Sequence, residues 1–247
     1  MFLETIHIDK AFGAEKVLDS LSLQLGEHEM LSILGRSGSG KTTLLKILAG
    51  LEAPDAGQVL LKGEDIGPIP PNRRNIVYLY QEPLLFPHLD VFENVAFGLR
   101  LRRLPEAEIK KRVQEMLANL ELPEQARKKP QQLSGGQRQR VAFGRALIIN
   151  PKVLLLDEPF GALDAETRAS MQQLLKRIAR DFAITAIFVT HSLKEALAMG
   201  DRIGLMQDGK LKVYGSKKAF IDDGDTGAQA EMEFWRGWER GGDPLNG

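Results

Sequence analysis

Three stretches near the start of the chain alternate between apolar and polar positions. They are Phe2–Ile8, Leu21–Leu25 and Gln58–Leu61, and the third follows the turn-rich segment Ala53–Gly57. A period of two places every second side chain on the same face, which is typical of strands with one buried face. We therefore predict an antiparallel β layer.

A second group of strands is more apolar. Val153–Leu156 is an unbroken apolar run of the kind found in strands buried on both faces. Further short strands are predicted at Met30–Leu34, Ile76–Tyr80, Thr185–Val189, Ile203–Met206 and Leu211–Tyr214. Helical patterns separate several of them, at 43–49, 171–178 and Leu193–Met199. Alternating strands and helices predict a wound α/β core with a mixed or parallel sheet.

The stretch at about 83–150 is different, because its pattern is helical. Val91–Leu101 is mostly apolar, and Ile109 begins a series of apolar positions that continues at i+4, i+7, i+8 and i+11. This spacing forms one face of an amphipathic helix. We predict a helical subdomain inserted into a domain of residues 1–222. Its basic clusters at 100–103, 110–112 and 127–129 are interpreted as solvated faces, the alternative being binding patches.

The remaining residues, 223–247, are expected to form a C-terminal tail without an additional β domain. Phe234, Trp235 and Trp238 are spaced so that a short helix could place them on a hydrophobic area of the core. We prefer this docked helix to the alternative, an anchor for a partner protein.

Composition narrows the class of protein. The 247 residues contain 33 Lys plus Arg and 33 Asp plus Glu, so nothing indicates a nucleic-acid footprint over the whole surface. There is no cysteine, which excludes disulfides and thiolate metal sites. No apolar run approaches the roughly 20 residues needed to span a bilayer, and the N-terminal stretch lacks the pattern of a secretory signal. We expect a cytoplasmic protein that reaches the membrane only through a partner.

One glycine-rich stretch carries the strongest signal. Residues 35–42, Gly-Arg-Ser-Gly-Ser-Gly-Lys-Thr, match G-x-x-x-x-G-K-[ST] and lie between a predicted strand and a predicted helix. Glycines let backbone N–H groups turn towards phosphate oxygens, and the helix N-terminus favours an anion. Lys41 can then reach the β- and γ-phosphates, and the Thr42 hydroxyl can bind Mg²⁺. The alternative, a turn that only links a strand to a helix, does not require Lys-Thr after the last glycine.

Several polar residues follow predicted strands. Asp157 and Glu158 come after an apolar strand, and in an open α/β sheet ligands bind outside the carboxyl ends of the strands. We expect Asp157 to hold Mg²⁺ and Glu158 to polarise the attacking water. Gln81 and His191 also follow strands. From there Gln81 could approach the metal or the water, and His191 could contact the γ-phosphate. Together with Lys41 and Thr42 they predict a phosphoryl-transfer site.

A second anion site is predicted at Ser134–Gln137, before a helix expected to begin at Arg138. Ser134, Gly135 and Gly136 offer a hydroxyl and free N–H groups at a helix N-terminus. If the two phosphate-binding ends lie far apart in one copy, a head-to-tail two-fold dimer would let each nucleotide lie between both kinds of site.

These motifs together resemble the ATP-binding subunit of ABC transporters, over about residues 2–214. Residues 35–42 match the Walker A motif, 133–137 the family signature, 153–158 the Walker B motif and 161–164 the D-loop. Gln81 matches the Q-loop glutamine and His191 the switch histidine. Phe12 falls where the family stacks an aromatic ring, usually Tyr, on adenine.

The resemblance implies a set of site residues for ATP and Mg²⁺. Catalytic roles fall on Lys41, Gln81, Glu158 and His191, and Mg²⁺ ligation on Thr42, Gln81 and Asp157. The ATP-binding residues are Phe12, Gly35, Arg36, Ser37, Gly38, Ser39, Gly40, Lys41, Thr42 and Thr43. In the partner subunit Ser134, Gly135, Gly136 and Gln137 would contact the same ATP, with Asp164 in the D-loop.

The segments 84–88 and 91–97 are similar to importer subunits of the branch that serves iron, sulfate, molybdate, polyamines and thiamine. The resemblance implies a homodimeric ATPase at the inner face of the membrane that powers separate permease subunits. Many members of this branch carry a C-terminal β domain of roughly a hundred residues, for which this chain is too short. Three alternatives remain: an ABC exporter subunit, an ABC-type ATPase outside transport, and a small-molecule P-loop kinase, which would not need residues 133–137 or Asp164.

Overall fold

The computed structural model describes residues 1–239. Its larger sheet has six strands in the order β10-β9-β3-β8-β7-β6. Their bounds are β3 Met30–Leu34, β6 Ile76–Leu79, β7 Val153–Asp157, β8 Ala186–Thr190, β9 Arg202–Gln207 and β10 Lys210–Val213. All neighbouring pairs are parallel except β10 with β9. Strands β7 and β8 are buried at every position, as the apolar runs predict.

The second sheet is antiparallel, in the order β2-β1-β4-β5. Its strands are β1 Leu3–Phe12, β2 Glu15–Leu25, β4 Ala56–Leu61 and β5 Glu64–Asp65. The structure confirms the expected antiparallel layer, although β1 and β2 are longer than their alternating segments and β5 was not predicted. Register shifts at residues 5–11 of β1 break the period of two, so the alternation underestimates this strand.

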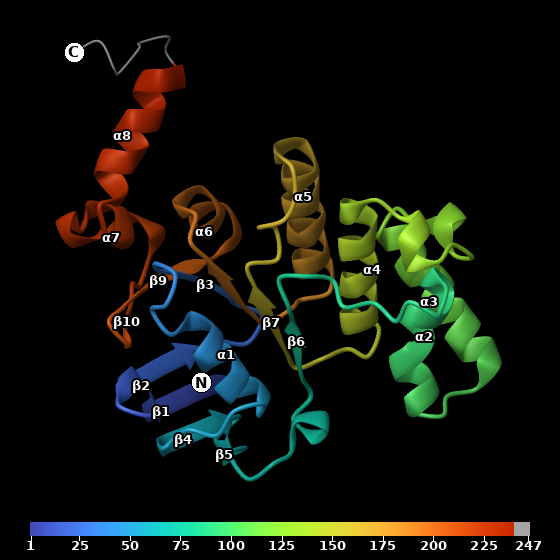
Figure 1. Cartoon of the computed structure of the whole chain (residues 1–247), viewed down its shortest axis with the longest axis horizontal. Helices are drawn as coiled ribbons and strands as arrows, with labels where there is room; N and C mark the ends of the chain where they lie inside the picture. The colour runs from blue at the N-terminus through green and yellow to red at the C-terminus, as the bar shows by residue number, and fades with distance from the viewer. Residues whose placement is uncertain (240–247) are drawn as a thin grey trace.

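Helices flank the larger sheet (Figure 1). They are α1 Lys41–Ala49, α5 Ala165–Asp181, α6 Leu193–Met199 and α7 Lys217–Asp222. Helix α1 buries Leu44, Leu45 and Leu48 in a core cluster that also takes side chains from both sheets. Because that cluster joins the two sheets through α1, the helix that follows the glycine-rich loop is fixed on several sides. The fold is thus an α/β arrangement with a mostly parallel sheet, an antiparallel layer and added helices, as predicted.

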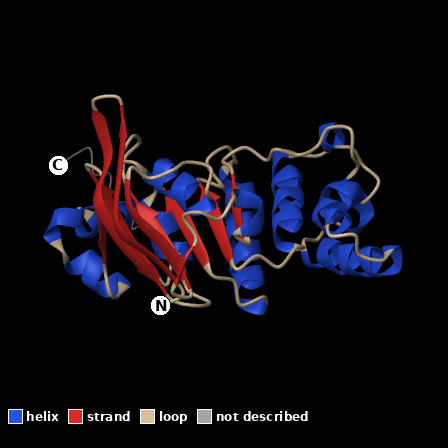
Figure 2. Cartoon of the chain, turned by 90° about the horizontal axis from the view of Figure 1, so that it is seen from below, coloured by secondary structure: helices blue, strands red, loops and turns tan. Residues whose placement is uncertain are grey.

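Between β6 and β7 the chain forms a mainly helical part, at the opposite end of the molecule from the antiparallel sheet (Figures 1 and 2). It contains α2 Val91–Leu101, α3 Glu106–Asn119 and α4 Gly135–Leu147. Short 3₁₀ turns lie in this part at Pro123–Gln125 and Pro130–Gln132, and elsewhere in the fold at Pro71–Arg73 and Gly224–Thr226. The apolar faces of α2, α3 and α4 pack into one cluster with Leu154 and Leu156 of β7. The inserted segment therefore shares its core with the sheet.

The C-terminal segment is more ordered than its glycine-rich sequence suggests. Helix α8, Ala228–Glu239, begins against α7, where Ala228 is buried and Met232 packs on the same small cluster. The helix then points away from the body (Figure 1). The Lys194 ammonium lies 3.6 Å from the centre of the Trp235 ring, whereas Phe234 is 48% exposed. The first turns are docked as expected, but Phe234 does not cover the core, and the Trp238 side chain lies outside the described residues.

Among residues 1–239 no helix is both long and apolar enough to pass through a lipid bilayer.

Candidate phosphoryl-transfer site

The site lies where four parallel strands end at one edge of the larger sheet. The register pairs Leu34 with Thr190, Asp157 with Val189, and Leu79 with Leu156. These pairs align the carboxyl ends of β3, β8, β7 and β6. The loop that follows β3 and the predicted residues Gln81, Glu158 and His191 therefore emerge along the same edge, as expected for ligand sites in open α/β sheets.

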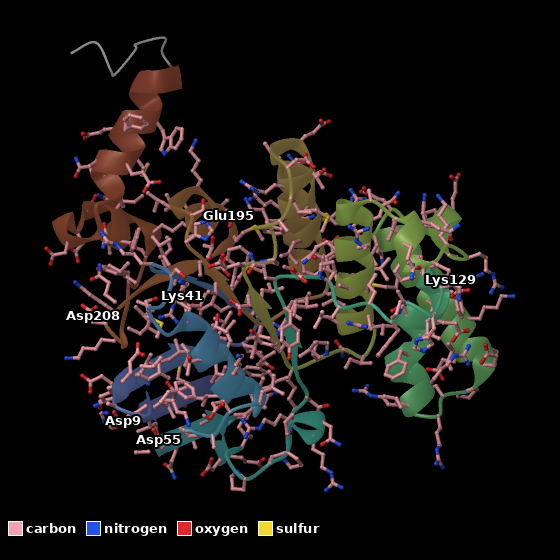
Figure 3. The ribbon with its side chains drawn as sticks, in the orientation of Figure 1. Asp9, Lys41, Asp55, Lys129, Glu195 and Asp208 are labelled. Atoms are coloured by element: carbon pink, nitrogen blue, oxygen red, sulfur yellow. The ribbon has the colours of Figure 1, made fainter. Side chains whose placement is uncertain are left out.

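The glycine-rich loop encloses its own lysine. Nζ of Lys41 donates to the carbonyl oxygens of Gly35 and Arg36, at 2.7 and 2.8 Å. Burial lowers the pKa of the Lys41 ammonium, while the nearby carboxylates of Glu158 and Asp157 oppose this effect. A cation whose partners are only neutral carbonyls can exchange them for phosphate oxygens, which are stronger acceptors. Figure 3 shows Lys41 at the start of α1.

Two glycines of the loop are required by close contacts. A Cβ on Gly35 would lie 2.5 Å from the backbone oxygen of Met206 in β9. Gly40 has φ 100° and precedes α1, and a Cβ there would lie 2.8 Å from the carbonyl oxygen of Val17. Any side chain at either position would displace the loop from β9 or β2. Arg36, Ser37 and Gly38, at the tip of the loop, are exposed.

Asp157 is the centre of a hydrogen-bond cluster. The Thr42 hydroxyl donates to it, with Oγ1 at 2.9 Å from Oδ2 and 3.2 Å from Oδ1. The Tyr78 hydroxyl lies 2.5 Å from Oδ2 of the same carboxylate. Burial, together with this hydrogen bond to Asp157, raises the pKa of Tyr78 well above its ordinary value, so the phenol remains a donor. Threonine hydroxyl and carboxylate oxygens are the ligands that Mg²⁺ prefers, and therefore this pair fits a Mg²⁺ site.

Glu158 and His191 contact each other across β7 and β8. Nδ1 of His191 lies 2.9 Å from Oε2 of Glu158. Glu158 has φ 44°, a region that residues other than glycine enter at a cost of roughly 1 to 3 kcal/mol. Its N–H donates to the carbonyl oxygen of Val189 at 3.0 Å. The turn after β7 is thus held to β8 by both main chain and side chain.

Gln81 lies beside the turn that follows Glu158. Its Nε2 is 2.9 Å from the point that a Cβ on Gly161 would occupy, and the Gly161 N–H donates to the Glu158 carbonyl oxygen at 3.1 Å. The side chain of Gln81 is therefore next to the segment expected to be the D-loop. Its role as a Mg²⁺ ligand stays a prediction.

A buried acid behind His191 was not predicted. Glu195 of α6 is 8% exposed and accepts a hydrogen bond from the Thr190 hydroxyl at 2.6 Å (Figure 3). Nε of Arg168 lies 3.8 Å from its other oxygen. Arg168 in turn donates to the carbonyl oxygen of Leu163. This cluster connects β8, the strand that precedes His191, to the segment 161–164. A glutamate in a short amphipathic helix gives no sign of such burial in its sequence.

The helix at the second predicted anion site begins three residues earlier than expected. Helix α4 starts at Gly135, not Arg138, because Ser134 forms its N-cap: the Gln137 N–H donates to the Ser134 hydroxyl, and the Ser134 N–H donates to Oε1 of Gln137. The prediction missed this reciprocal cap and placed Gly135 and Gly136 outside the helix.

The start of α4 opens onto a hollow of about 330 Å³, lined in part by Ser134, Gly136, Gln137 and Arg140. Among the described residues, none of the glycine-rich loop lines this hollow. Helix α4 lies on the other side of β6 and β7 from α1 (Figure 1). The two predicted anion sites are therefore separate in one copy of the chain.

A family model described as ABC transporter matches residues 18–161, more than half of the chain. The chain belongs to the ABC transporter family.

Relatives within the ABC transporter family are close. The spermidine/putrescine import ATP-binding protein PotA of Haemophilus influenzae is 48% identical over 221 residues, which are 90% of this chain and 59% of PotA. The sulfate/thiosulfate import ATP-binding protein CysA of Methylococcus capsulatus is 48% identical over 226 residues, 90% of this chain and 65% of CysA. The chain thus spans less than two thirds of the length of these relatives. The importer branch of the ABC transporter family, predicted from residues 84–97, is confirmed.

A solved dimeric structure of a bacterial ABC transporter cassette superposes with a TM-score of 0.76 at 35% identity. The match covers 85% of this chain and 97% of the cassette. It confirms the fold of the ABC ATPase cassette for this chain.

The remaining predicted ABC motif residues have clear local environments. Phe12 ends β1 and is 50% exposed, with the Lys10 ammonium 5.1 Å from the centre of its ring. Asp164 is the N-cap of α5, where it accepts a hydrogen bond from the Thr167 N–H at 2.9 Å. That bond lowers the pKa of Asp164. Thr43 lies in the first turn of α1.

Proposed function

We propose that the chain binds ATP with Mg²⁺, hydrolyses it in a two-fold dimer, and thereby powers a separate membrane permease, in the direction of import. The observation that carries this proposal is the meeting of Lys41, Asp157, Glu158 and His191 at one sheet edge. Membership of the ABC transporter family and the names of the relatives support it.

In this site the chain's own groups would bind the nucleotide and orient its phosphates. Residues 35–43 surround the phosphates with N–H groups and the Lys41 ammonium, while Phe12 stacks on adenine. Thr42 and Asp157, with Gln81 as a further ligand, would hold Mg²⁺, which when bound neutralises charge on the phosphates. Glu158 accepts a hydrogen bond from the attacking water and polarises it. His191 lies next to Glu158, where it would contact the γ-phosphate.

The separation of the two anion sites supports a dimer. A two-fold head-to-tail pair would set Ser134–Gln137 of one copy against the nucleotide of the other, with Asp164 in the same interface. In this proposal residues 1–222 form the ATP-binding domain, with the helical subdomain at about 83–150 inserted in it, and 223–247 form the tail. The dimer would lie at the inner face of the membrane, attached through the permease.

Hydrolysis measured against protein concentration tests this function. If each active site needs two copies, the rate per chain should rise with concentration and reach a plateau as dimers form. The Glu158→Gln variant with ATP and Mg²⁺ should elute as a dimer in size-exclusion chromatography. A rate per chain that stays constant from the monomeric to the dimeric range would overturn the shared site, and absence of hydrolysis at every concentration would overturn the ATPase.

A further inference from the structure

The Asp157 carboxylate has two hydroxyl donors, and they come from different parts of the fold. Thr42 belongs to the nucleotide-binding loop and helix α1, and its Oγ1 contacts both carboxylate oxygens. Tyr78 belongs to strand β6, and its hydroxyl contacts only Oδ2, at 2.5 Å. Asp157 itself is 8% exposed, so neither donor is readily replaced by water.

Tyr78 is held in place by its strand and by packing. In β6 it is paired with Leu155 of β7, two residues before Asp157. Its ring packs at the edge of the core cluster beneath α1. The ring of Tyr80 stands perpendicular to it, with the centroids 4.5 Å apart. The phenol oxygen therefore has little freedom to leave Asp157.

A fixed donor has a specific effect on a metal-binding carboxylate. When the Thr42 oxygen directs a lone pair to a metal ion, its single O–H can still donate to Asp157, but that hydroxyl then serves both the metal and the carboxylate. Tyr78 lies in β6, outside the nucleotide-binding loop, and can serve the carboxylate alone. A hydrogen bond to Oδ2 from the sheet restricts rotation of the carboxylate and leaves Oδ1 without a contact to Tyr78. Such outer hydrogen bonds orient metal ligands, and their loss costs roughly 10- to 100-fold in metal affinity.

We propose that Tyr78 is a positioning residue for Mg²⁺, which fixes the Asp157 carboxylate from the sheet so that this carboxylate and the Thr42 hydroxyl would hold the metal. The inference rests on the proposed function, because Mg²⁺ would bind together with ATP. It concerns a residue that acts through Asp157 and does not touch the nucleotide.

The test compares Tyr78→Phe with Tyr80→Phe. Both changes remove one phenol oxygen and keep the ring, but among the described residues the Tyr80 hydroxyl makes no hydrogen bond, and Tyr80 is 42% exposed. ATP affinity is measured with a fluorescent ATP analogue, first in EDTA and then across a Mg²⁺ titration. We expect Tyr78→Phe to raise the half-saturating Mg²⁺ concentration about 10-fold and to leave affinity in EDTA unchanged. Tyr80→Phe should match the wild type in both.

Each other outcome has a distinct meaning. An unchanged Mg²⁺ requirement in Tyr78→Phe overturns the inference, and so does an equal loss of affinity in EDTA, which would show that Tyr78 only supports the loop. If the wild type binds no ATP in Mg²⁺, the proposed function itself fails. Thermal unfolding of each variant checks folding, and Tyr78→Met, which fills similar space without a donor, should show the same shift if Tyr78→Phe does not fold.

Discussion

Nδ1 of His191 lies 2.9 Å from Oε2 of Glu158. An ionised carboxylate can only accept, so Nδ1 carries the shared proton and a neutral His191 has no proton on Nε2. In that state His191 holds Glu158 but cannot donate to a γ-phosphate. Contact with the phosphate therefore requires His191 either to carry a second proton or to release Glu158, which links the positions of the two side chains.

This pairing makes Glu158→Gln a clean probe of the reaction. The amide oxygen of glutamine can still accept from His191, whereas the charge that polarises water is lost. We expect ATP affinity to stay within a factor of about two and turnover to fall by about 10² to 10⁴. Single-turnover hydrolysis together with equilibrium binding separates the two effects. Near-wild-type turnover would remove Glu158 from the chemistry.

Ser134 has two possible roles, and a matched variant can separate them. Ser134→Ala removes the N-cap of α4, and Ser216→Ala removes an equivalent serine cap from α7, where Ser216 accepts from the Ala219 N–H at 3.1 Å. Each loss should cost about 1 kcal/mol of unfolding free energy. Only Ser134→Ala should also reduce the dimer-dependent ATPase rate while the monomer still binds ATP. Equal rates in the two variants would confine Ser134 to capping.

The contact between Gly35 and β9 predicts a loss of nucleotide binding. In Gly35→Ala the new methyl group would collide with the Met206 carbonyl oxygen, which is backbone and cannot rotate away. A displaced loop should weaken ATP binding at least about tenfold, equivalent to 1.4 kcal/mol. Gly215→Ala is the control, because a Cβ there meets no atom of the described residues within 4 Å. Isothermal titration calorimetry of both variants with ATP measures the difference in affinity. Equal affinities would show that the loop tolerates the methyl group.

Glu195 should matter for stability. In Glu195→Leu the buried Thr190 hydroxyl would lose its acceptor, and Arg168, which is partly exposed, would lose its neighbouring charge. We expect a loss of about 2 kcal/mol in urea unfolding. Asp181→Asn breaks the exposed pair with Arg180 and should cost less than about 0.5 kcal/mol. Similar losses of unfolding free energy in both variants would show that the buried contacts of Glu195 stabilise the fold no more than an exposed ion pair does.

Apolar pattern predicted much of the fold because it reports burial directly. Strand Met30–Leu34 and helices Val91–Leu101 and Leu193–Met199 have the bounds that the pattern indicates. The start of α4 was missed, since Gly135 and Gly136 are poor helix formers whose cost is offset by the Ser134 cap. Where local preference and tertiary contacts disagree, the pattern shows only the preference.

The candidate site was predictable where a motif names its residues, but its supporting contacts were not. The register of four strands brings Lys41, Asp157, Glu158 and His191 to one edge. Tyr78 and Glu195 were not singled out, because a tyrosine in an apolar strand and an acid in a short helix are equally compatible with exposed polar atoms. Only the packing of distant elements shows which hydrogen bonds those atoms make.

The core shared by α4 and β7 has a consequence for how two copies would communicate. One end of this packed block carries Ser134, which in the proposed dimer faces the partner's nucleotide, and the other carries Asp157, which faces its own. Closely packed interiors compress little, so a displacement at one end must appear at the other. Each copy would then form a stiff connection between two ATP molecules, and the loss of a phosphate at one of them would displace residues at both nucleotide sites.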